Sequence, residues 1–114
     1  MLIKLYTYNM RLSEVSKLEN AEPLDYRKMA KMYEKIADFL CEIGAHELAI
    51  DFYMKMKNAA ALLPGDPEFG DLEISRAAIL SIAQTYGNDL SEYEKASEFY
   101  EKLFRNSIGY CSCK

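Results

Sequence analysis

Apolar residues recur at helical spacing along almost the whole chain. Residues three and four positions apart share one face of an α-helix, so this recurrence predicts helices that each bury one face. No stretch alternates between apolar and polar residues for long enough to indicate a β-strand. The pattern therefore predicts an all-α fold with about five helices, at residues 2–20, 23–43, 45–63, 67–87 and 91–107.

Residues that favour helix starts stand near the predicted N-termini. Pro23 and Pro67 are expected at first helical positions, where a missing N–H costs nothing. Asp66 is expected to cap the helix that follows it. Ser91 and Glu94 have the spacing of a capping box, in which each side chain accepts a backbone N–H at the helix start.

Glycines and a turn-rich segment mark the predicted helix ends. Gly44 and Gly87 follow predicted helices, where a left-handed residue closes the last turn. The segment LPGDPEFG at residues 63–70 combines prolines, glycines and an aspartate, which is typical of a turn between helical hairpins.

Small residues recur with a long period. Ala37 and Ala83 stand 46 residues apart, and Ala49 and Ala96 stand 47 apart, so one residue is inserted in the second hairpin turn. An alanine at a helix crossing lets two helix axes approach closely. The spacing predicts one domain over residues 1–107, made of a half repeat (1–22) and two helical hairpins (23–66 and 67–107), followed by a disordered tail (108–114).

These positions resemble the pattern of the tetratricopeptide-repeat (TPR) superfamily. The first copy is carried by Tyr33, Ile36, Ala37, Leu40, Gly44, Ala49 and Tyr53, and the second by Ile79, Ile82, Ala83, Tyr86, Ala96 and Tyr100. The period exceeds the usual 34 residues. Met56 and Leu103 also stand where a further alanine is common, and no proline closes the first unit near Ala61.

The resemblance implies a TPR-like α-α superhelix that binds a protein or peptide on the concave face of its first helices. The long helices are also similar to extended repeats of nuclear scaffold proteins, which implies scaffolding at replication forks, DNA repair and contact with histone chaperones. Amphipathic helices in short-loop pairs also form ordinary bundles. A structural or regulatory bundle without a groove ligand is therefore the alternative.

Composition narrows the class of protein. The chain has 114 residues, half of them apolar, a net charge of −4 and a pI near 5.0. An acidic surface repels phosphates, so we expect no nucleic acid as main partner. We also expect no membrane span and no signal peptide, because the apolar runs are too short. The three cysteines are an odd, unevenly spread set, which indicates a reduced intracellular setting, nucleus or cytoplasm.

Few residues suggest chemistry at a site. His46 is the single histidine and is expected to be a solvated turn residue. No Ser/His/Asp set is apparent, so we expect no enzyme. Cys111 and Cys113 would supply only half of a zinc site. We therefore expect no catalytic residue, metal or cofactor.

One acidic ridge is a candidate partner-binding surface. Glu34, Asp38 and Glu42 are spaced four residues apart and share one helix face. By the resemblance this face lines the concave surface, and the ligand would be a basic peptide or protein. The candidate residues are Lys31, Glu34, Asp38, Cys41, Glu42, Leu80, Gln84 and Asn88. An ordinary solvated charged face is the alternative.

The last predicted helix offers apolar residues at an open end. Phe99, Leu103 and Phe104 have no following unit to cover them in this sequence. Exposed apolar surface favours association, so we expect self-association through this end. Alternatively, these side chains turn inward against the helix predicted at 67–87.

Overall fold

The structure is a computed structural model that describes the backbone of residues 2–111 and the side chains of residues 2–104. Within that range the chain is all-α and has no β-strand, which confirms the predicted fold class. The elements are α1 (Leu2–Glu19), α2 (Tyr26–Glu42), α3 (His46–Ala61), α4 (Leu72–Gln84), the π-helical turn η1 (Thr85–Asp89) and α5 (Tyr93–Cys111). None of these helices is both long and apolar enough to cross a lipid bilayer.

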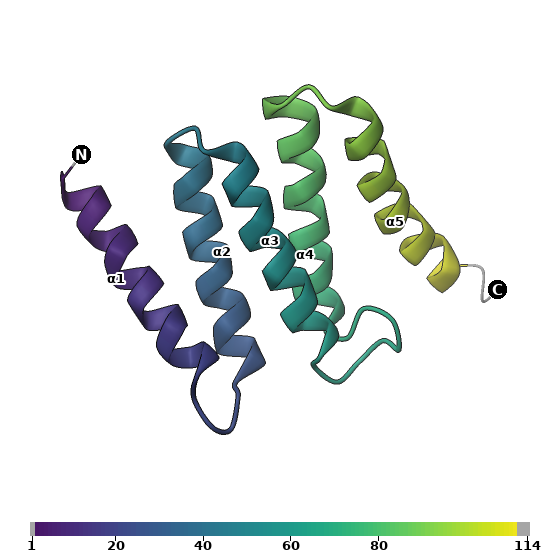
Figure 1. Cartoon of the computed structure of the whole chain (residues 1–114). Helices are drawn as coiled ribbons and strands as arrows, with labels where there is room; N and C mark the ends of the chain where they lie inside the picture. The colour runs from purple at the N-terminus through teal and green to yellow at the C-terminus, as the bar shows by residue number, and fades with distance from the viewer. Residues whose placement is uncertain (1, 112–114) are drawn as a thin grey trace.

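The helices form a row in which each packs mainly against its neighbours in sequence. Figure 1 shows α1 and α5 at opposite ends of the row, with successive helices running in opposite directions. The row measures 52 × 38 × 15 Å. An elongated, thin array of this kind is consistent with the predicted helical-repeat arrangement, because each unit contacts only the units beside it.

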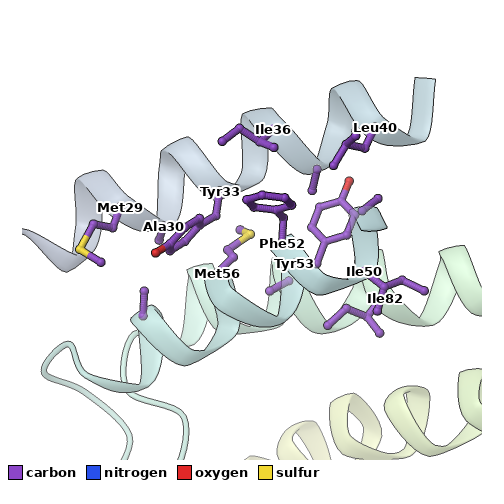
Figure 2. Close-up of a cluster of buried hydrophobic side chains, with 14 of the residues drawn as sticks. Met29, Ala30, Tyr33, Ile36, Leu40, Ile50, Phe52, Tyr53, Met56 and Ile82 are labelled. Carbon is purple, nitrogen blue, oxygen red and sulfur yellow. The ribbon is translucent and has the colours of Figure 1, made fainter. Parts of the chain in front are cut away.

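The densest part of the core lies between α2 and α3. Figure 2 shows Tyr33 of α2 beside Phe52 and Met56 of α3, and the ring centroids of Tyr33 and Phe52 lie 6.3 Å apart. The four alanines predicted at helix crossings are all buried: Ala37, Ala49, Ala83 and Ala96. The prediction that small residues occupy the closest helix contacts is therefore consistent with the packing.

The predicted starts of α2 and α4 are wrong. The second helix begins at Tyr26, not Pro23, because Asp25 caps it by accepting the N–H of Lys28 at 3.1 Å. The fourth helix begins at Leu72, not Pro67, because Asp71 accepts the N–H of Ile74 at 3.0 Å. In both cases an aspartate after the proline provides the stronger helix start.

Asp66 closes a loop instead of capping a helix. Its Oδ2 accepts the N–H groups of Glu68 and Phe69, and its backbone exchanges two 2.8 Å hydrogen bonds with Gly70. Gly70 has a φ of +66°, and a Cβ there would lie 2.0 Å from the carbonyl oxygen of Ala60. This glycine is required because the loop folds directly onto the end of α3.

The two hairpin turns differ. Gly44 adopts a φ of +86°, and the next N–H, of Ala45, donates to the carbonyl of Leu40 at 2.8 Å, which confirms the predicted helix end. The predicted role of Gly87 is wrong, because Gly87 lies inside η1. A π-turn accommodates one extra residue in a helix. It therefore explains how the insertion inferred in this hairpin is accommodated.

The predicted capping box of Ser91 and Glu94 is also wrong. Ser91 has a φ of +54°, and the first helical bond of α5 runs from the N–H of Ala96 to the carbonyl of Glu92. At its other end α5 continues to Cys111, past the boundary at residue 107 expected from the sequence. The remainder of the predicted tail, residues 112–114, lies outside the described residues.

Candidate partner-binding faces

The acidic ridge of α2 does not present three equivalent carboxylates. Glu42 accepts a 2.6 Å charged hydrogen bond from Lys4 Nζ, and both side chains are exposed. The ammonium of Lys4 holds the pKa of Glu42 below its usual value. This pair joins the N-terminal part of α1 to the C-terminal end of α2, so Glu42 already has a partner within the chain.

Asp38 also has an internal partner. The hydroxyl of Tyr53, on α3, donates a hydrogen bond to Asp38 Oδ1. Burial first, and then this carboxylate, raise the pKa of Tyr53 above its ordinary value. Two of the three ridge residues thus hold neighbouring helices against α2, which sequence spacing alone does not reveal.

Glu34 faces a different environment, a small pocket between α2, α3 and α4. The pocket has a volume of about 170 Å³ and is lined by Ala30, Lys31, Glu34, Met56, Glu73, Ile74 and Ala77. Glu34 and Glu73 belong to the first helices of the two hairpins. Both therefore line one pocket together with apolar residues, on the face where the sequence placed a partner.

Cys41 makes a second contact between α2 and the following hairpin. Its Sγ lies 3.9 Å from Oγ1 of Thr85, the first residue of η1. The thiol is free and partly buried. The contact shows that the α2 face turned toward α4 extends from Lys31 and Glu34 to the end of the helix.

The three candidate residues of the second hairpin are exposed. Leu80 and Gln84 lie on α4, and Asn88 lies in η1. Helical spacing puts Leu80 and Gln84 on the same face of α4 as Glu73 and Ala77. We call the combined surface of α2 and α4 the first-helix face; its residues are Lys31, Glu34, Cys41, Glu73, Ile74, Ala77, Leu80 and Gln84.

Sequence reasoning missed Glu73. The residue is inside the helix predicted from position 67, and it is eleven positions before Gln84, which is close to three helical turns. That spacing was a usable signal. Its place beside Glu34 in one pocket could not be read from the sequence, because it depends on how α2 and α4 both pack on α3.

His46 is not the solvated turn residue that the sequence suggested. It is the first residue of α3, is partly buried, and its Nδ1 lies 3.5 Å from Oδ2 of Asp89 in η1. The pair connects the turn of one hairpin to that of the next. Among the side chains that the structure describes, no three His, Cys, Asp or Glu residues could share a metal ion.

The structure does not test the expectation that Cys111 and Cys113 bind no metal. Cys113 lies outside the described residues, and the side chain of Cys111 is not among those described.

The end of the row formed by α5 is partly apolar. Phe99 turns inward, with its ring centroid 5.9 Å from that of Tyr86, whereas Phe104 is 63% exposed. An open hollow is lined by Ser97, Tyr100, Glu101, Leu103 and Phe104. The residues expected to form one apolar end face therefore divide between the core and the surface.

The amino-acid sequence of the chain is similar to part of a known protein. Over 81 residues, or 71% of this chain, the sequence is 33% identical to Tonsoku-like protein of Drosophila melanogaster. The matched stretch is only 5% of that protein's length. No family model and no solved structure matches the chain. The match agrees with the resemblance to extended scaffold repeats, whereas the resemblance to TPR proteins depends on the residue pattern.

Proposed function

We propose that this chain is a protein-interaction module of a scaffold and binds a basic peptide or protein segment on its first-helix face. The observation that supports this most directly is the shared pocket of Glu34 and Glu73. Two carboxylates from successive hairpins, beside an apolar floor, are a suitable site for a lysine or arginine side chain. The charged group of the partner's lysine or arginine would pair with the carboxylates, while the aliphatic part of the same side chain would pack on Ile74 and Ala77.

The other candidate partner-binding residues would contact the partner elsewhere or hold the helices in place. Lys31 borders the pocket and would pair with a carboxylate of the partner. Leu80, Gln84 and Asn88 extend the contact along the second hairpin, and Cys41 lies near its end. Asp38 and Glu42 act indirectly, by holding α3 and α1 in place through Tyr53 and Lys4.

A titration with a defined probe tests the proposal. The probe is a fluorescein-labelled peptide of alternating lysine and leucine, and binding is followed by fluorescence anisotropy. We expect Glu34→Gln with Glu73→Gln to weaken binding about tenfold, equivalent to about 1.4 kcal/mol. Added salt should weaken the wild-type complex further, because charge pairs are screened.

The matched control is Asp51→Asn with Glu98→Gln. Both residues are exposed, neither is in a described ion pair, and the pair changes the net charge by the same amount. Equal loss of affinity in the two double variants would mean that the peptide responds only to overall charge, and the proposed pocket would be rejected.

The cellular setting is a further part of this proposal. Similarity to Tonsoku-like protein supports a scaffold role, and the resemblance implies a nuclear role at replication forks with histone chaperones. Fluorescence microscopy of the tagged full-length gene product should show it at sites of DNA synthesis after replication is blocked. An exclusively cytoplasmic signal would remove the DNA-repair setting while leaving the peptide-binding module intact.

A structural or regulatory bundle without a groove ligand is the second candidate. The internal pairs of Asp38 with Tyr53 and Glu42 with Lys4 favour it, because they use ridge carboxylates for stability. The peptide titration separates the two functions, since a bundle without a groove ligand would show no saturable binding.

A further inference from the structure

A second groove, of opposite charge, lies between α1 and α2. It has a volume of about 430 Å³ and is lined by Glu14, Lys17, Leu18, Lys28, Lys31, Met32 and Lys35. We propose that this lysine groove binds an acidic peptide segment that carries an apolar anchor residue. The proposal does not depend on the first-helix face, which shares only Lys31 with this groove and takes a basic partner.

The lysines form an organised cluster. Lys28, Lys31 and Lys35 are spaced three and four residues apart, so α2 presents them along one face. Lys17 approaches from α1. All four side chains are exposed, and none of them is in an ion pair among the described residues. Their charge is therefore available to a ligand.

Few carboxylates oppose this charge. Glu14 is the acidic residue that lines the groove with the lysines. Glu19 is held by the hydroxyl of Tyr33, and Asp25 is used in capping α2. Glu34 lines the pocket on the other side of Lys31. In a chain of net charge −4, a local excess of lysine is a departure from the rest of the surface.

The floor of the groove explains why the ligand needs an apolar residue. Leu18 of α1 and Met32 of α2 are both partly buried and line the groove together. Methionine is flexible and polarisable, so it adapts to varied apolar side chains. Lysine stems add further apolar surface while their ammonium groups remain in water.

The two helices that form the walls are fixed relative to each other. Tyr8 stacks on Phe39 with ring centroids 5.4 Å apart, and Arg11 donates to the carbonyl of Lys35. At the C-terminal end of α1, the hydroxyl of Tyr33 on α2 donates a hydrogen bond to Glu19. A groove held at both ends is available without rearrangement of the helices, which lowers the cost of binding.

A peptide is a better occupant than nucleic acid or an anionic membrane. Those polyanions require an extended basic surface, and the acidic balance of this chain opposes them. A short acidic segment needs only the local cluster. Its carboxylates would pair with the lysines, while its apolar anchor would contact Leu18 and Met32.

The test compares four labelled probes against the full chain: a glutamate-rich peptide with one phenylalanine, the same peptide with alanine in that place, single-stranded oligothymidylate, and phosphatidylserine vesicles. We expect the first to bind most tightly and the second more weakly. Lys17→Gln, Lys28→Gln and Lys35→Gln together should weaken the first about tenfold, since each exposed pair contributes a modest amount.

The control triple variant is Lys55→Gln, Lys95→Gln and Lys102→Gln, which removes the same charge from α3 and α5. Met32→Gln tests the apolar floor and should weaken the phenylalanine peptide but not the alanine peptide. The thermal midpoint of each variant shows that it folds.

Equal losses for the two triple variants, or tighter binding of oligothymidylate or vesicles than of the phenylalanine peptide, would overturn the proposal. The lysine–leucine probe of the first-helix face should be unaffected by Met32→Gln. Failure of one groove is therefore distinguishable from failure of the other.

Discussion

The second helices of the two hairpins, α3 and α5, have similar spacing but different surroundings. α3 lies between α2 and α4 and buries seven residues: Ala49, Ile50, Phe52, Tyr53, Met56, Ala59 and Ala60. α5 packs on α4 and η1, and within residues 93–104 only Ala96 is buried.

Two equivalent tyrosines make this difference measurable. Tyr53 and Tyr100 are related by the 47-residue offset, yet Tyr53 is 4% exposed and Tyr100 is 42% exposed. A repeat position becomes core only when a neighbour covers it. The comparison teaches that the sequence pattern marks capacity for burial, while position in the row decides whether burial occurs.

The largest expected effect comes from removing these tyrosines. Tyr53→Ala should lower the free energy of unfolding by about 3–5 kcal/mol, as truncation of a buried aromatic residue does. Tyr100→Ala should cost about 1 kcal/mol or less, because surface substitutions remove few contacts. Urea unfolding measures both. Equal losses would show that α5 is as well covered as α3, and the comparison would be wrong.

Overpacking the close crossings should have a smaller effect. Ala49→Leu and Ala96→Leu should each destabilise by roughly 1–3 kcal/mol, with the larger loss at Ala49, which is enclosed by helices on both sides. Ala61→Leu, at an exposed position of α3, is the control. Thermal melts that show no loss for either buried variant would contradict a close crossing.

The hydroxyl of Tyr53 provides a pH-dependent test. Burial and Asp38 raise its pKa in the folded state, and burial and Glu19 do the same for Tyr33. A tyrosine whose pKa is higher in the folded than in the unfolded state stabilises the fold while both states are protonated. This stability is present below the ordinary tyrosine pKa of 10.0 and is lost as the pH rises above it. The chain should therefore lose stability above about pH 10.

Tyr53→Phe should reduce that alkaline loss and should cost about 1 kcal/mol at neutral pH through the missing hydrogen bond. Tyr100→Phe is the control, because its hydroxyl has no partner among the described hydrogen bonds and the residue is 42% exposed. Urea unfolding midpoints, measured for the wild type and both variants across the alkaline pH range, test this expectation. If stability fell equally with pH in the wild type and in Tyr53→Phe, the hydrogen bond between Tyr53 and Asp38 would not cause the alkaline loss.

The smallest expected effect is weak self-association at the α5 end. Tyr100 and Phe104 leave apolar surface uncovered, so the average mass in sedimentation should rise with protein concentration. Tyr100→Ser with Phe104→Ser should reduce this rise without lowering stability much. A chain that stays monomeric throughout would show that the exposed stripe is too small to associate.

The sequence alone determined the features that depend on neighbouring residues. Helical spacing identified five helices and their apolar faces, and Gly44 marked the end of α2, where its left-handed φ closes the helix. The alanines at 46–47-residue spacing identified four buried positions. These properties are local, because backbone geometry and side-chain periodicity determine them over a few turns.

The sequence alone did not determine where the helices start, because several capping residues compete within a short distance. Asp66 and Asp71 both precede α4, and the folded loop uses the first for a turn and the second for the cap. The choice depends on the contact of Gly70 with the end of α3, and this contact brings together segments that local propensity does not relate.

Only the tertiary structure decided which charges are free. Asp38 is engaged by Tyr53 and Glu42 by Lys4, a residue 38 positions away. The pocket lined by both Glu34 and Glu73, and the lysine groove beside Met32, likewise depend on how whole helices are placed. A periodic pattern shows which face a side chain occupies, but not which distant residue faces it. The partner surfaces of this chain therefore follow from helix packing, whereas its helices follow from the sequence pattern.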